Sequence, residues 1–538
     1  MKILYDELGS TLTIPKTHNP TPLSINSIFD IAEMLSTSLG PSGLDKIIQT
    51  KDSEIIVTND GATILENLDS NAIFVTMDDN SPTIKASVNA VYKIILGLSK
   101  AQDDNIGDGT TSIVIIAAEL LKRLFLLVEK GFNIMMIIRN LGKVISEIEA
   151  FLLDNYNEAN FEKDAIFAAK NALYSKIVSF KRPSVLEETK KSFSIFRRSE
   201  ETLESRNDIS KICLDAINYS RRGNFLNLNN IKIISKPGAS ISKSIFIEGI
   251  LINKSLAHPQ MKKQSNGKIG LLAAPLELPK TKTKANFSIK TAEEFENYEN
   301  YEKKYFARII QTLKEKEINI LLCQFGFEDE LTSMLTENGI LGVRWVGGTE
   351  MENTALLLGA SIASQVDNIE GFPGEIKELN FGTEGEKMIE VTSGNKSEIC
   401  TILVRGSTEM TIKESERSIH DALCGIRNLL TDNRIVYGGG AIENDIYNFL
   451  IKKSLSYPDH SETFVAFARA IQEIPRILLR NQGLNLNILQ KLGNNVGITG
   501  DMKELGVFET VKSKLSQIRM AKEVACRLLK IDEMIFTD

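Results

Sequence analysis

The fold is decided by the stretch Asp103-Asp104-Asn105-Ile106-Gly107-Asp108-Gly109-Thr110-Thr111-Ser112, which runs directly into the apolar segment 113–128. Its two glycines let the backbone approach a phosphate closely, and the first turn of a helix offers unpaired N–H donors. Thr110 and Thr111 add hydroxyl groups, and Asp108 between the glycines could hold a magnesium ion. The stretch therefore predicts a phosphate- and metal-binding loop that opens a buried helix, although a Gly-Asp-Gly sequence alone also fits an ordinary turn.

The composition is that of a folded protein with several domains. The 538 residues are 42% hydrophobic and 25% charged, which is ordinary for globular proteins, and the length predicts about three or four domains. A net charge of −7 opposes attraction to a phosphate backbone, so nucleic acid is not the expected partner. Five cysteines stand singly without a CxxC pair, which argues against a disulfide framework or a zinc site and favours a reducing compartment.

Neither a signal peptide nor a membrane span is expected. The N-terminal segment turns acidic at Asp6 and Glu7 before an apolar core could form, and charged residues such as Glu119 and Lys122 interrupt the longest apolar runs. We therefore expect a cytoplasmic protein that does not contact a membrane.

Three further glycine-bearing loops accompany the central one. They are Leu39-Gly40-Pro41-Ser42-Gly43, then Asn59-Asp60-Gly61-Ala62-Thr63 after a strand-like run at 54–58, and much later Gly438-Gly439-Gly440-Ala441. None is a GxxxxGK[ST] or GxGxxG motif, which disfavours a P-loop or a Rossmann site. The loops suit a nucleotide site walled by backbone, whereas the triple glycine alone also fits a flexible hinge.

Two more aspartates are candidates for the chemistry of such a site. Asp60 lies in a tight loop, and Asp421 falls on a helix predicted over 410–430. Hydrolysis of a phosphoanhydride needs a metal that neutralises charge and a carboxylate that orients the attacking water. Asp60, Asp108 and Asp421 would suffice if the fold brought them together, but each alone also fits a helix cap or a solvated residue.

The order of elements predicts nested domains. Helical patterns dominate 1–145 and 436–538, more polar mixed segments cover 146–228 and 371–435, and short β-rich runs fill 229–370. The fold class that we predict is multidomain α/β, with a mostly helical outer domain, a mixed α/β middle domain and an inserted α/β inner domain.

The inner segment predicts several strands and one long helix. The β-rich runs are at 244–252, 269–274, 318–323 and 342–346. The charged helix expected over 292–317 carries aromatic and apolar residues at spacings of three and four. That stripe is typical of an ordinary core-facing helix, and a docking surface for other chains is the alternative.

The four loops, in this order and at these separations, resemble the nucleotide site of group II chaperonins over essentially the whole chain. Four other stretches look like one subunit type of the eukaryotic cytosolic chaperonin: 5–9, 99–104, 343–348 and 427–437. The resemblance implies that the outer domain is the equatorial ATP-binding domain, the middle one the intermediate domain, and the inner one the apical substrate-binding domain with a helical protrusion.

The resemblance also assigns roles to individual residues. The implied ATP-binding residues are Leu39, Gly40, Pro41, Gly61, Gly109, Thr110, Thr111, Lys176, Gly439, Gly440 and Glu509. Among these, Lys176 would sense the terminal phosphate and Glu509 would contact the ribose. Asp108 would bind Mg²⁺, and Asp60 and Asp421 would arrange the attacking water.

The function implied is that of an ATP-dependent chaperone subunit. ATP binding and hydrolysis would drive closure of a chamber that folds bound polypeptides, with paralogous subunits in a hetero-oligomeric double ring and non-native polypeptides as partners. Two alternatives stay open: a ring subunit that binds nucleotide but scarcely hydrolyses it, and a lone phosphotransferase, which the large inserted domain and the absence of a second-substrate motif disfavour.

Overall fold

A computed structural model describes residues 3–5, 11–13, 20–50, 53, 55–68, 82–173, 200–278, 291–381, 386–395 and 397–531. The chain forms two compact units: Met1–Leu214 with Lys413–Asp538, and Asp215–Ile412. The first unit thus joins segments from both ends of the sequence, whereas the second is continuous. The finer division into three domains stays a prediction.

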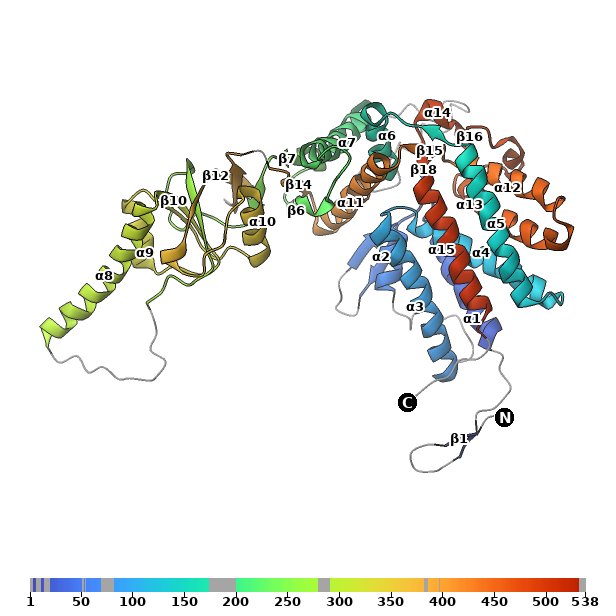
Figure 1. Ribbon diagram of the computed structural model, residues 1–538, viewed down its shortest axis with the longest axis horizontal. Helices are drawn as coiled ribbons and strands as arrows, with labels where there is room; N and C mark the ends of the chain where they lie inside the picture. Colours follow the sequence, from blue (N-terminus) through green and yellow to red (C-terminus); the bar gives the residue numbers. More distant parts are fainter. Residues whose placement is uncertain are drawn as a thin grey trace. The chain divides into compact units, whose positions relative to one another are not determined.

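The first unit is built around α4 (Thr110–Glu129), which is buried along most of its length. A helix that is apolar on nearly all sides needs neighbours on every side, and helices from both halves of the sequence provide them. Figure 1 shows α15, in red, among the blue and cyan helices of the N-terminal half. The helices of this bundle are α1 (Pro20–Ser36), α3 (Pro82–Asn105), α4, α5 (Ile134–Asp154), α12 (Ala441–Ser454), α13 (Ser461–Asn481) and α15 (Val511–Leu529).

Short strands place the loops of this unit. The antiparallel pair β3 (Lys46–Gln49) and β4 (Ile55–Thr58) leads into α2 (Gly61–Asn67). A second sheet has the order β18 (Phe508–Thr510), β15 (Arg434–Tyr437) and β5 (Asn157–Glu158). Further elements are β1 (Ile3–Tyr5), β2 (Thr11–Thr13), α6 (Phe161–Leu173), α7 (Glu200–Ser220), α11 (Glu409–Thr431), β16 (Val496–Gly497), β17 (Gly500–Asp501) and α14 (Met502–Leu505). The strand predicted at 54–58 and the helix predicted over 410–430 are confirmed.

The second unit contains a six-stranded sheet of order β11-β10-β9-β12-β13-β8. Strands β9, β10 and β11 are parallel, and β12, β13 and β8 continue the sheet in antiparallel pairs. Parallel neighbours need crossover connections, and α8 and α9 supply them. The bounds are β9 (Gln264–Leu272), α8 (Ala292–Glu315), β10 (Ile318–Cys323), α9 (Asp329–Glu337), β11 (Leu341–Val343), α10 (Gly348–Leu358), β12 (Gly371–Phe381) and β13 (Glu386–Ser393).

The chain changes sheets within the β-rich run predicted at 244–252. β7 (Ile245–Ile247) pairs with β14 (Cys400–Gly406), whereas β8 (Ile250–Ile252) pairs with β13. Gly249 lies at the change of sheet, where a Cβ would stand 2.3 Å from the carbonyl oxygen of Val391. The predicted β structure is therefore confirmed, although periodicity could not show which sheet each strand joins. β6 (Ile231–Pro237) completes the smaller sheet on the other side of β14.

The other predicted elements of this unit are confirmed within a few residues. The run at 318–323 is β10, the run at 269–274 is the end of β9, and the run at 342–346 overlaps β11. The helix predicted over 292–317 is α8, and its two halves differ. Phe306 and Leu313 are buried in the core, whereas Phe295 and Tyr301 are more than half exposed. Among the described residues, no helix is both long and apolar enough to span a membrane.

Candidate nucleotide site

Asp60 ties the start of α2 to the start of α4. Its Oδ2 accepts hydrogen bonds from the backbone N–H of Thr63 (2.9 Å) and from the Thr63 hydroxyl (2.7 Å), which makes Asp60 the N-cap of α2. Its Oδ1 accepts a bond from the Thr110 hydroxyl at 3.0 Å. Gly61 lies so close to Thr111 that a Cβ would stand 2.6 Å from its Oγ1. The loop at 59–63 and the loop before α4 thus form one cluster.

The loop before α4 presents its backbone to this cluster. Gly109 is the N-cap of α4 with φ of 78°, a left-handed conformation that favours glycine. No side chain caps this helix start, so its first N–H groups have no partner within the helix. Asp108 is exposed beside it, and its carbonyl oxygen accepts a 2.7 Å bond from Gln102 Nε2.

Helix α11 holds the same loop from the other side. Asn428 Nδ2 and Arg427 Nη2 donate to the carbonyl oxygen of Ile106 at 2.8 and 3.2 Å. A Cβ on Gly107 would stand 2.5 Å from both Cβ and Sγ of Cys424. The loop that carries Asp108 is therefore packed directly on the helix that carries Asp421.

The electrostatics at Cys424 place Asp421 in the same neighbourhood. Burial raises the pKa of the Cys424 thiol to about 12; Arg427 opposes this shift, and the carboxylates of Asp421, Asp103 and Asp108 add to it. All three carboxylates thus lie near one thiol. Asp421 itself is half-buried.

The glycine loops at 39–43 and 438–441 pack on consecutive turns of α13. Gly40, with φ of 85°, packs so closely on Leu478 that a Cβ would stand 2.2 Å from Cδ2. Gly440, with φ of 86°, caps α12 and would bring a Cβ within 2.8 Å of Pro475 Cβ. Because Pro475 and Leu478 are three residues apart on one helix face, α13 fixes the two loops together.

The end of α13 also fixes the position of Leu39. Asn481 Nδ2 donates to the carbonyl oxygens of Ser36 (2.8 Å) and Leu39 (2.9 Å). The N–H of Gly43 donates to the carbonyl oxygen of Gly40 at 2.9 Å, which closes the turn around Pro41. The predicted phosphate-contacting residues 39–41 are therefore held by hydrogen bonds at both ends.

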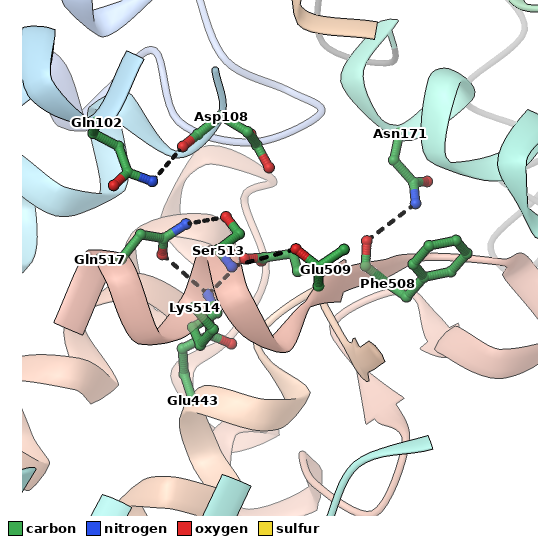
Figure 2. A network of polar contacts seen from close by, with 10 residues as sticks. Gln102, Asp108, Asn171, Glu443, Phe508, Glu509, Ser513, Lys514 and Gln517 are labelled. Carbon is green, nitrogen blue, oxygen red and sulfur yellow. Dashed lines mark hydrogen bonds and ion pairs between the residues drawn. The ribbon is translucent and has the colours of Figure 1, made fainter. Parts of the chain in front are cut away.

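Glu509 lies beside the triple-glycine loop. Strand β18 pairs with β15 so that Glu509 is opposite Val436, and the N–H of Gly438 donates to the carbonyl oxygen of Val507 at 3.1 Å. Gly439 has φ of 65° and packs on Met502. Figure 2 shows Glu509 joined to a buried network of polar side chains at the start of α15.

Most of the predicted site residues thus come together in the first unit. Asp60, Gly61, Asp108, Gly109, Thr110, Thr111 and Asp421 gather around the start of α4, while Leu39, Gly40, Pro41, Gly439, Gly440 and Glu509 lie on the elements that adjoin α13 and β18. Lys176 lies outside the described residues. Among those that are described, no group of three His, Cys, Asp or Glu side chains could hold a metal ion by itself.

Sequence reasoning missed the residues that support the loops: Gln102, Arg427, Asn428, Glu443, Asn481, Lys514 and Gln517. One signal was present, because Lys514 takes a place in the apolar stripe Val511, Ile518 and Ala521 of α15. A lysine on the buried face of a helix needs a partner, and that partner could have been sought among the acidic residues near the glycine loops.

Nearly the whole chain is similar in sequence to known proteins. A model of the TCP-1/cpn60 chaperonin family matches residues 31–538, and the chain therefore belongs to that family. It is 37% identical to T-complex protein 1 subunit epsilon of Encephalitozoon cuniculi, across 99% of this chain and 98% of the relative.

Archaeal relatives are also similar along most of their length. Thermosome subunit beta of Methanothermobacter thermautotrophicus is 30% identical, covering 94% of this chain and 89% of its own. Thermosome subunit beta of Aeropyrum pernix is 28% identical, across 95% of this chain and 90% of the relative. The predicted chaperonin fold, the function as a group II chaperonin subunit and the resemblance to an epsilon-type subunit are confirmed.

Proposed function

We propose that this chain is an ATP-hydrolysing subunit of a cytoplasmic, hetero-oligomeric double-ring chaperonin, which uses ATP and Mg²⁺ to close over non-native polypeptides. The observation that carries the proposal is the convergence of four glycine loops and three aspartates, distant in sequence, within one compact unit. Relatives that are named as subunits support the assembly with paralogous chains.

Backbone groups would bind the phosphates. The uncapped start of α4 directs the N–H groups after Gly109 away from the helix, and a helix start favours negative charge. Thr111 would add a hydroxyl donor, and Thr110, whose hydroxyl donates to Asp60, would contribute its backbone N–H. Gly61 would contact the nucleotide through its backbone, and residues 39–41 would close the other side. Gly439, Gly440 and Glu509 would contact the nucleoside, with the Glu509 carboxylate accepting a bond from a ribose hydroxyl.

Asp108 fits a magnesium ion. Its side chain is exposed next to the helix start, and Mg²⁺ at nucleotide sites takes one or two carboxylates and completes its shell with phosphate oxygens and water. The ion would neutralise the charge that develops on the phosphates. Lys176 would contact the terminal phosphate.

Asp60 and Asp421 would orient the attacking water. The Thr63 and Thr110 hydroxyls fix the rotamer of Asp60, so its carboxylate is oriented before a ligand binds. Asp421 lies on α11, which packs on the Asp108 loop through Cys424, so its place in the site would depend on that packing. Hydrolysis would therefore depend on the position of α11. The hydrogen bonds of Arg427 and Asn428 to the Asp108 loop would couple a movement of α11 to the nucleotide site.

The exposed half of α8 supports a polypeptide-binding role for the second unit. Phe295 and Tyr301 expose 56% and 59% of their surface. Large exposed apolar side chains suit contact with non-native chains. The protrusion and its closure over a substrate are part of the proposal.

Replacement of Asp421 tests the hydrolytic role. In the assembled particle, Asp421→Ala should leave ATP binding to this chain largely intact and lower hydrolysis at this chain's own site by roughly tenfold or more. Glu409→Ala is a matched control, because Glu409 is an exposed carboxylate on the same helix. Unchanged turnover in Asp421→Ala would favour a subunit that binds nucleotide without hydrolysing it, and elution of the wild-type chain as a monomer in size-exclusion chromatography would contradict the ring.

A further inference from the structure

Lys514 is a buried cation held between two carboxylates at the start of α15. Its Nζ lies 2.6 Å from Glu443 Oε1 and 2.8 Å from Glu509 Oε2. The side chains of Lys514 and Glu443 are 4% and 3% exposed, whereas that of Glu509 is 27% exposed. Replacement of a buried ion pair by well-packed apolar residues is often neutral or stabilising, so stability alone does not explain this cluster.

All the hydrogen-bonding capacity of Lys514 is used inside the protein. Burial alone would lower its pKa, but the carboxylates of Glu443 and Glu509 outweigh burial and raise the pKa above its ordinary value. The ammonium has three donors, and its acceptors are the two carboxylates and Gln517 Oε1 at 3.3 Å. Lys514 therefore has no donor left for a ligand and acts only through its partners.

These partners lie at opposite ends of the proposed nucleotide site. Glu509 Oε1 lies near Gly438, 3.7 Å from where a Cβ would stand. The Gln517 amide lies beside Gly109, where a Cβ would stand 2.1 Å from Nε2. Figure 2 shows the chain of bonds from Glu509 through Lys514 to Gln517 and Ser513. One ammonium thus sets the distance between the carboxylate at the ribose end and the helix start at the phosphate end.

We propose that Lys514 is a positioning residue that fixes the Glu509 carboxylate for a ribose hydroxyl and so makes the site selective for ribonucleotides. The inference rests on the proposed function, since it takes Glu509 as the ribose contact. A site built to bind a hydroxyl discriminates against an analogue that lacks it, because the acceptor held in place for that hydroxyl then loses a hydrogen bond. Without Lys514, Glu509 gains other rotamers and that discrimination falls.

The test measures nucleotide preference on this chain within its native assembly. The assembly is labelled with 8-azido-ATP in the presence of Mg²⁺, with ATP, 2′-deoxy-ATP or 3′-deoxy-ATP added as competitor. The labelled chain is then separated from its partners by mass. In the wild type, at least one deoxy analogue should compete about tenfold less well than ATP. In Lys514→Met this preference for ATP over the deoxy analogue should fall to about twofold or less. Lys512 is an exposed lysine of the same helix, and Lys512→Met should keep the preference.

A second variant separates positioning from charge and folding. Lys514→Met alone leaves Glu443 buried without its cation, which can prevent folding. The double variant Glu443→Gln with Lys514→Met removes one charge of each sign, so the cluster keeps its net charge of minus one. It should also lose the ribose preference. A general structural defect would weaken all three nucleotides equally and leave the ratio unchanged.

The outcomes distinguish the inference from the function on which it rests. A retained preference in the Lys514 variants, together with a lost preference in Glu509→Ala, would overturn the positioning role alone. Equal competition by all three nucleotides in the wild type, or an unchanged ratio in Glu509→Ala, would overturn the ribose contact and the positioning role together. Loss of the preference for ATP over the deoxy analogue in Lys514→Met, the double variant and Glu509→Ala, but not in Lys512→Met, supports the proposal.

Discussion

Asp60 combines a structural and a proposed chemical role, and substitution can separate the two. Asp60→Ala removes the N-cap of α2, which costs about 1 kcal/mol, and two hydroxyl bonds to a carboxylate, at about 1 kcal/mol each in a half-buried setting. The local stability of α2 should therefore fall by about 3 kcal/mol.

Asp60→Asn is the informative variant. An amide oxygen can still cap α2, and the Thr110 hydroxyl can turn from donor to acceptor, so the cost should be no more than about 1 kcal/mol. Hydrolysis at this chain's own site should nevertheless fall by roughly tenfold or more, because the amide carries no charge to orient water. Asn67→Ala is the control, since it removes a side-chain bond within α2, from Asn67 Nδ2 to the carbonyl oxygen of Thr63, and should lower the stability of α2 with little effect on turnover.

The assay needs a local measure of stability. The only tryptophan, Trp345, lies in the unit Asp215–Ile412 and does not report on α2. Hydrogen–deuterium exchange of the peptide covering 61–67 gives the opening free energy directly, and single-turnover hydrolysis gives the rate. If Asp60→Asn hydrolysed ATP within twofold of the wild type, Asp60 would be a helix cap and no more.

Three other expectations follow from particular contacts. Gly249→Ala should lower the stability of the second unit by about 1–3 kcal/mol, because its Cβ would overlap the carbonyl oxygen of Val391; the urea midpoint followed by Trp345 fluorescence measures this loss, and an unchanged midpoint would contradict the tight packing at the sheet change. Cys424, with a pKa of about 12, should be alkylated far more slowly at pH 8 in the native particle than in urea, as mass spectrometry would show, because little thiolate is present. Since the pKa of Lys514 is raised above 10.5, its contribution to stability is fully present below pH 10.5 and is lost only as pH rises through the higher folded value. The stability difference between the wild type and the double variant Glu443→Gln with Lys514→Met should therefore be constant from about pH 7 to 9, and thermal unfolding at several pH values would expose any decline.

The glycine loops could be located from the sequence because their chemistry is local. Gly40, Gly109, Gly439 and Gly440 all have positive φ, and such positions favour glycine whatever surrounds them. The helix after Thr111 was equally predictable, because a continuous apolar run of that length is typical of a buried helix. These features depend on neighbours in the chain and need no knowledge of the fold.

The supports of the loops could not be found in the same way. The partners Lys514 and Glu443 are distant in sequence and meet only because β15 and β18 pair. The strands β12 and β13 were not predicted, because their charged residues gave the segment a polar character. The alternation of Glu375 and Lys377 with apolar residues is nevertheless typical of a half-buried strand, so this signal was present in the sequence. Register and pairing are tertiary properties, and a single sequence leaves them undetermined.

The discontinuous first unit has a consequence for synthesis on the ribosome. Helix α4 packs against α15, and some 400 residues separate the ends of these helices, so that at typical rates of translation roughly 20–80 s pass before the second helix exists. The continuous unit Asp215–Ile412 is complete earlier. The faces of α4 that α13 and α15 cover therefore lack these two neighbours until translation is nearly complete, and the nascent chain exposes that apolar surface in the meantime.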